Sequence, residues 1–153
     1  MRSLIVFLAT GFYSGYAPVA PGTAGSVVGL VLVWIVWGPL WTRSPWLCLL
    51  VFAIAFVIAC WISDRAERIF ENHDDSHIVI DEVLGMAATM FGNPTAFGWL
   101  LAGFLLFRIA DVIKPWPASW FDRRMRNGTG VMLDDLAAAI YANIVLHVIV
   151  RVL

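Results

Sequence analysis

Residues 104–117 read FLLFRIADVIKPWP, an apolar segment that acquires charged side chains before it stops at a proline. Arg108, Asp111 and Lys114 follow at intervals of three, so on a helix they form one slanted stripe. Pro115 favours the end of the helix there, because proline has no N–H to donate. The stretch predicts a membrane helix whose charged end reaches the membrane surface.

The composition of the whole chain agrees with a membrane protein. Of its 153 residues, 61% are hydrophobic, and the mean hydropathy is +0.82. Soluble domains are only about 45–50% apolar. The length predicts one domain over residues 1–153. A net charge of -1 without a basic run argues against nucleic-acid binding. We expect an all-α, integral membrane helical bundle with short spans and a polar site on its cytoplasmic face.

Five apolar segments are candidates to cross the bilayer, and each is short against the roughly 20 residues that a span needs. An apolar segment at residues 3–13 precedes SGYAPVAPGTAGS (14–26), whose glycines and prolines predict an ordered loop. A short amphipathic helix is expected around residues 118–125. The candidate spans are residues 26–41, 45–62, 78–91, 97–113 and 136–153, of which 78–91 has the weakest pattern.

Alternating crossings would place the 64–77 and 114–131 loops on one side of the membrane. The second of these loops carries Lys114, Arg123, Arg124 and Arg126, whereas Arg43 is alone in the opposite loop. Because cytoplasmic loops are enriched in Lys and Arg, this side is predicted to be cytoplasmic.

The same topology brings acidic and basic groups to the cytoplasmic ends of several segments. Clustered carboxylates repel each other unless a cation lies between them, and hard oxygen ligands suit Mg²⁺. Arg and Lys beside such a cluster suit phosphate oxygens. The acidic candidates are Asp81, Glu82, Asp111, Asp134 and Asp135, and the basic ones are Arg108, Lys114 and Arg123.

Simpler interpretations remain open for individual residues. Charged groups at helix ends are usually solvated, and Asp134 could cap the last helix. Thr23 and Ser26 could meet an anion where the small-residue stretch enters a span, although such a stretch is more often just a loop. His147 is expected to be a hydrogen-bonded core residue, and His73 and His77 to belong to a solvated loop.

Five blocks together resemble the phosphatidylglycerophosphatase A family and occur in that family's order. They are YAPVAPGTAGS (16–26), DEVLGM (81–86), FRIADVIKPWP (107–117), WFDRR (120–124) and GTGVMLDD (128–135). The resemblance implies a Mg²⁺-dependent phosphatase of the bacterial inner membrane, with its site on the cytoplasmic side. Its substrate would be the lipid phosphatidylglycerophosphate, hydrolysed to phosphatidylglycerol in phospholipid biosynthesis.

The resemblance also implies residue roles by matching position. Asp81, Glu82, Asp111, Asp134 and Asp135 would be the catalytic and metal-binding acids, and Thr23, Ser26, Arg108, Lys114 and Arg123 the substrate contacts. Which acid binds metal, which acts as base, the number of ions, the possibility of a covalent intermediate and the oligomeric state stay open.

Two other functions are alternatives for a membrane protein with clustered charges. A CDP-alcohol phosphotransferase also clusters aspartates in a membrane, but its long D-G-x-x-A-R pattern is absent. An ion-coupled carrier would place charges nearer the middle of the membrane and usually shows an internal repeat. The sequence shows neither feature.

Overall fold

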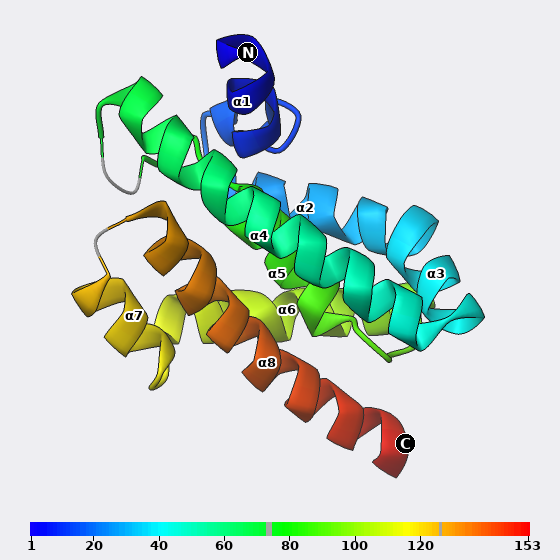
Figure 1. Ribbon diagram of the computed structural model, residues 1–153. Coiled ribbons are helices and arrows are strands. Elements are labelled where there is room, and N and C mark those ends of the chain that lie inside the picture. Colours follow the sequence, from blue (N-terminus) through cyan, green and yellow to red (C-terminus); the bar gives the residue numbers. More distant parts are fainter. Residues whose placement is uncertain (73–74, 126) are drawn as a thin grey trace.

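The computed structural model describes residues 1–72, 75–125 and 127–153, and these residues form a bundle of helices with no described β-strand (Figure 1). The expected all-α fold is confirmed. The helices are α1 (Arg2–Ala9), α2 (Pro21–Leu32), α3 (Gly38–Arg43), α4 (Pro45–Phe70), α5 (Ile80–Thr89), α6 (Phe97–Ile113), α7 (Ala118–Arg124) and α8 (Gly128–Val152). A π-helical turn at Val33–Trp37 joins α2 to α3.

Among the described residues, three helical segments are long and apolar enough to cross a membrane. They are Pro21–Arg43, Pro45–Phe70 and Gly128–Val152, with 23, 26 and 25 residues. Each exceeds the ~20 residues that cross a ~30 Å hydrocarbon core. These segments are therefore longer than expected. The helix expected over residues 97–113 is α6, with 17 residues, and the expected amphipathic helix is α7.

The predicted loop over residues 14–26 is wrong in its second half, because α2 begins at Pro21. Proline suits the first helical position, where its missing N–H would have no partner. The small residues that follow serve packing: a Cβ on Gly25 would lie 2.7 Å from Val79 Cβ, and one on Gly29 would lie 2.8 Å from Met86 Cβ. Helix α2 thus packs against α5 at close range.

Helix α5 has ten residues and is about 15 Å long at ~1.5 Å per residue. It is too short to cross a membrane alone, which corrects the expected span at 78–91. Its last carbonyl groups find a partner in α8, where Asn143 Nδ2 donates to Thr89 O and Phe91 O at 2.8 Å each. A short helix can therefore end inside the bundle without unsatisfied carbonyls.

The turn after α5 lies at the end of the bundle where α3 also ends. A Cβ on Gly92 would lie 3.1 Å from the Trp41 ring and 3.2 Å from His147 Nε2. His147 Nδ1 is also 3.1 Å from Asn93 Nδ2, so His147 is a hydrogen-bonded packing residue, as expected.

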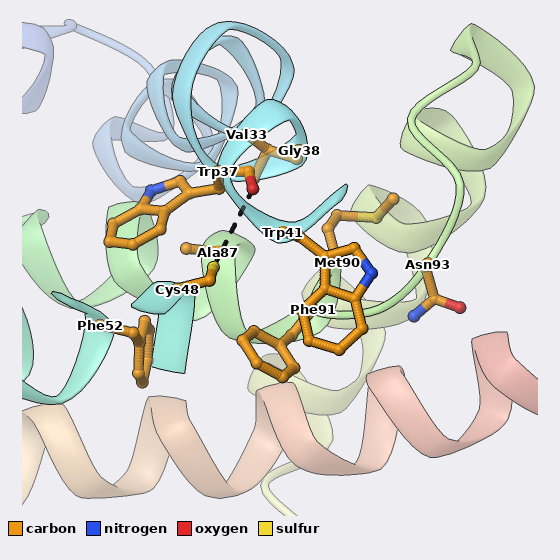
Figure 2. A pocket seen from close by; sticks show the side chains of 10 residues that line it. All are labelled: Val33, Trp37, Gly38, Trp41, Cys48, Phe52, Ala87, Met90, Phe91 and Asn93. Carbon is orange, nitrogen blue, oxygen red and sulfur yellow. Dashed lines mark hydrogen bonds between the residues drawn. The ribbon is translucent and has the colours of Figure 1, made fainter. Parts of the chain in front are cut away.

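Figure 2 shows the packing at this end, where Cys48 lies close to the backbone carbonyl of Trp37. The cavity there has a volume of about 10 Å³. That is about the space of one water molecule, so this cavity offers no room for a substrate.

Helix α8 begins eight residues before the apolar segment expected at residue 136. Asn127 is its N-cap and accepts a hydrogen bond from Gly130 N at 2.9 Å. Asp134 and Asp135 therefore lie within the helix instead of before it, and the alternative that Asp134 caps the helix is wrong. Asp64 of α4 accepts from Thr129 N at 3.2 Å, which ties the start of α8 to α4.

The end of α6, the short α7 and the start of α8 lie at the same end of the bundle, near the end of α4 (Figure 1). The predicted convergence of these segments is therefore present in the fold. His73 and Arg126 lie outside the described residues. His77 is half-buried and hydrogen-bonded to Asp75.

Candidate active site

Three helices bring five carboxylates to this end of the bundle. Asp81 and Glu82 lie in the first turn of α5, outside the three spanning helices. Asp111 lies in the last turn of α6, and Asp134 and Asp135 lie in the second turn of α8. Asp81, Asp134 and Asp135 are no more than 5% exposed. The acidic residues that are far apart in the sequence therefore form one buried group.

The tightest part of this group is formed by Asp81, Glu82 and Asp135. One carboxylate oxygen from each lies within 4.8 Å of the others. Oxygens that share a Mg²⁺ ion each lie about 2.1 Å from it, so they must be mutually this close. Asp111 is connected to the three through Arg108, whose Nη1 is 2.8 Å from Asp111 Oδ2 and 4.0 Å from Glu82 Oε1.

Several oxygens of the cluster have no hydrogen-bond partner among the described residues. They are Glu82 Oε2, Asp134 Oδ1 and Asp135 Oδ2, and all three are buried. A buried carboxylate oxygen without a partner is costly. The chemistry and spacing of these donors fit a divalent cation.

The electrostatics of the first turn of α5 point the same way. Burial raises the pKa of Glu82 well above its ordinary value, and the nearby charge of Asp81 raises it further. Burial also raises the pKa of Asp81. Both groups would hold protons more tightly than exposed carboxylates do, unless a cation replaces those protons.

Arg108 lies at the junction of α2, α5 and α6. Its Nη1 is 2.8 Å from Asp111 Oδ2 and 4.0 Å from Glu82 Oε1, and it donates to Ser26 Oγ at 3.5 Å. Ser26 Oγ in turn donates to Gly22 O at 2.9 Å. Ser26 and Arg108, each predicted as a substrate contact, therefore lie together beside the carboxylates.

Lys114 ends α6 in a left-handed backbone conformation, with φ of 46°. Its Nζ lies 2.5 Å from Asp134 Oδ2 and 2.5 Å from Asp122 Oδ1. Burial alone would lower the pKa of Lys114, but the two hydrogen-bonded carboxylates outweigh it and raise the pKa above its ordinary value. Lys114 is thus charged, and it uses two of its three N–H donors on carboxylates.

Two predicted substrate contacts are less directly placed. Thr23 lies half-buried in the first turn of α2. Arg123 is exposed on α7, where it lines a hollow with Trp116 and Trp120. Among the described residues, no ion pair joins Arg123 to the carboxylate cluster.

Sequence reasoning missed one residue that shapes the site. A Cβ on Gly22 would overlap Glu82 Oε1, so only glycine leaves room for that carboxylate beside α2. The sequence shows Gly22 only as part of a stretch of small residues. Because that stretch was expected to form a loop, Gly22 could not be assigned to the face of a helix.

Comparison with known proteins connects this geometry to a family. A family model described as phosphatidylglycerophosphatase A matches residues 7–150. The phosphatidylglycerophosphatase A of Escherichia coli is 38% identical over 147 residues, which cover 93% of this chain and 81% of the relative. That of Haemophilus influenzae is 38% identical over 146 residues, covering 95% and 88%.

A third relative carries a different name. The "Putative phosphatidylinositol-3-phosphatase" of Bacteroides thetaiotaomicron is 35% identical over 156 residues, covering 95% of this chain and 92% of the relative. No solved structure matches the chain at a significant level.

Proposed function

The chain belongs to the phosphatidylglycerophosphatase A family, a family of phosphatases, and from that premise we propose that it hydrolyses phosphatidylglycerophosphate. The products would be phosphatidylglycerol and inorganic phosphate. One geometric observation supports the proposal most directly. Carboxylates from three helices lie beside Arg108 and Lys114 at one end of an apolar bundle. A lipid substrate can present its phosphate at that end while its acyl chains stay in the membrane.

We propose Mg²⁺ as the cofactor, held by Asp81, Glu82 and Asp135 with Asp111 beside them. The unpartnered buried oxygens and the 4.8 Å spacing support this assignment. When bound, the ion supplies positive charge to phosphoryl oxygens and makes a bound water more acidic.

The protein's own groups supply orientation and proton handling. The Arg108 guanidinium has five N–H donors and is only partly used by Asp111 and Ser26, so the others can bind phosphate oxygens. Lys114 has one donor left for the same purpose. Asp134 Oδ1 is buried and unpartnered, and we propose that it accepts a proton from the attacking water. Phosphoryl transfer depends largely on such positioning and charge stabilisation.

We further propose that the site faces the cytoplasm in the bacterial inner membrane. Arg65, Arg68, Arg123 and Arg124 belong to segments at the end of the bundle that carries the carboxylates. Cytoplasmic segments are enriched in such residues.

The test is phosphate release by the purified protein in detergent micelles that contain phosphatidylglycerophosphate. We expect release with Mg²⁺ and none after chelation. Asp135→Asn should abolish release, whereas Glu71→Gln, which alters an exposed carboxylate near the same end, should leave it unchanged. Normal hydrolysis by Asp135→Asn would refute the site.

The name of the Bacteroides relative suggests a second lipid substrate for the same experiment. Phosphatidylinositol 3-phosphate is offered to the same preparation in the same micelles. A higher kcat/KM for this lipid than for phosphatidylglycerophosphate would overturn the proposed substrate and leave the phosphatase chemistry in place.

A further inference from the structure

An apolar groove of about 410 Å³ lies between α2 and α6. Val27 and Val31 line it from α2, Trp34 lines it from the π-helical turn that follows, and Phe97 and Leu101 line it from α6. All five side chains are at least 47% exposed, so the groove is open along the surface of the bundle. Its volume falls within the ~300–1,000 Å³ of typical small-molecule sites.

The groove lies on the same helix faces as residues of the proposed phosphate site. Residues 3, 4 and 7 apart share a helix face, so Thr23 lies on the α2 face that carries Val27. On α6, Arg108 is seven residues after Leu101 and shares its face. The two helices meet where Arg108 of α6 donates to Ser26 of α2. Both walls of the groove therefore lead toward residues of the site.

We propose that this groove holds one acyl chain of the lipid whose phosphate is bound at the carboxylate cluster. This inference rests on the proposed function and adds the position of the substrate's tail. From Val27 to Trp34 the groove extends about 10 Å along α2 and into the π-helical turn, at ~1.5 Å per residue, away from the phosphate site. The lining is apolar except for Thr95 at the far end.

The contribution of the groove is to orient the substrate more than to extract it from the membrane. Lipid tails are as apolar as the side chains that line the groove, so transfer between the two provides little hydrophobic free energy. Van der Waals contacts that fix one chain would instead align the phosphate with the carboxylates. The groove should therefore affect reaction of long-chain substrates more than short-chain ones.

The experiment compares dioleoyl and dihexanoyl phosphatidylglycerophosphate in the same detergent micelles. Val31→Trp fills the groove, and Leu101→Trp fills it from the other wall if the first variant does not fold. We expect the ratio of kcat/KM for the long-chain over the short-chain substrate to fall about 10-fold. Val57→Trp is the matched control, because Val57 is 68% exposed on α4 and should leave the ratio unchanged.

The outcomes separate this inference from the function on which it rests. An unchanged ratio in a folded groove variant, or an equal change in the Val57→Trp control, overturns the acyl-chain assignment while the phosphatase remains. A change of oligomeric state in Val31→Trp would assign the groove to a second copy of the chain and would also overturn it. Absence of activity on both substrates in the unaltered protein would refute the proposed function itself.

Discussion

Gly22→Ala should inactivate the enzyme while leaving the fold intact. The added Cβ would overlap Glu82 Oε1 and would lie 3.2 Å from the carboxyl carbon of Glu82 and 3.5 Å from Arg108 Nη1. The overlapping atom is the far end of a flexible side chain, so Glu82 can turn away without moving the backbone. Alanine is also the better helix former, by about 1 kcal/mol. We therefore expect unchanged or slightly higher stability.

The loss of activity follows from the displacement of one carboxylate. Glu82 belongs to the group of three oxygens within 4.8 Å, and its other oxygen is buried without a partner. Displacement of a catalytic group by about 1 Å can cost about 10²-fold in rate. Loss of one ligand should also raise the Mg²⁺ concentration needed for half-maximal activity.

The assay measures phosphate release against Mg²⁺ concentration, with thermal unfolding in detergent measured on the same preparation. Gly98→Ala is the matched control, because an added Cβ there meets nothing within 4 Å. A Gly22→Ala protein with kcat/KM within about 3-fold of the unaltered protein would show that Glu82 is not positioned for catalysis.

Three further predictions concern charge and packing. Lys114→Ala should destabilise the protein by about 3 kcal/mol in thermal or denaturant unfolding, because Asp134 stays buried without its cation. Adding Asp134→Asn to this variant should restore part of the lost stability. Asn143→Leu should cost about 1–3 kcal/mol in the same assay, because Thr89 O and Phe91 O lose their donor; an unchanged midpoint would contradict this. In calorimetry, Mg²⁺ binding should tighten as pH rises toward the raised pKa of Glu82, and each bound ion should release fewer protons, because Glu82 must lose its proton to bind the ion; pH-independent affinity would exclude this coupling.

Much of the fold could be predicted from apolar length and from the positions of charged residues. The bounds of α6 agree with the predicted segment because Pro115 ends it and the GNPT turn precedes it. The start of α2 could not be predicted in the same way. Glycine and proline ordinarily disfavour helices, and only the close packing on Val79 and Met86 makes them suitable here. That contact is a property of two helices, not of one segment.

The gathering of the carboxylates could be predicted because each lies at the same end of its segment. The individual ion-pair partners of these carboxylates could not be predicted. Lys114 was expected to bind phosphate, but its distances of 2.5 Å to Asp122 and Asp134 depend on how α6, α7 and α8 pack. The start of α8 could not be predicted either, because GTGVML is not a strong helix-forming sequence. Its cap by Asn127 and its contact with Asp64 decide where the helix begins.

The charge balance of the cluster supports the proposed ion at this place in the bundle. Six carboxylates, from Asp81, Glu82, Asp111, Asp122, Asp134 and Asp135, face two cations, Arg108 and Lys114, so four negative charges remain when all are ionised. A phosphate monoester would be repelled by that excess. One divalent ion would leave two negative charges, and a second ion would make the site neutral. Each ion would therefore lower the repulsion that the carboxylates by themselves exert on a doubly charged phosphate.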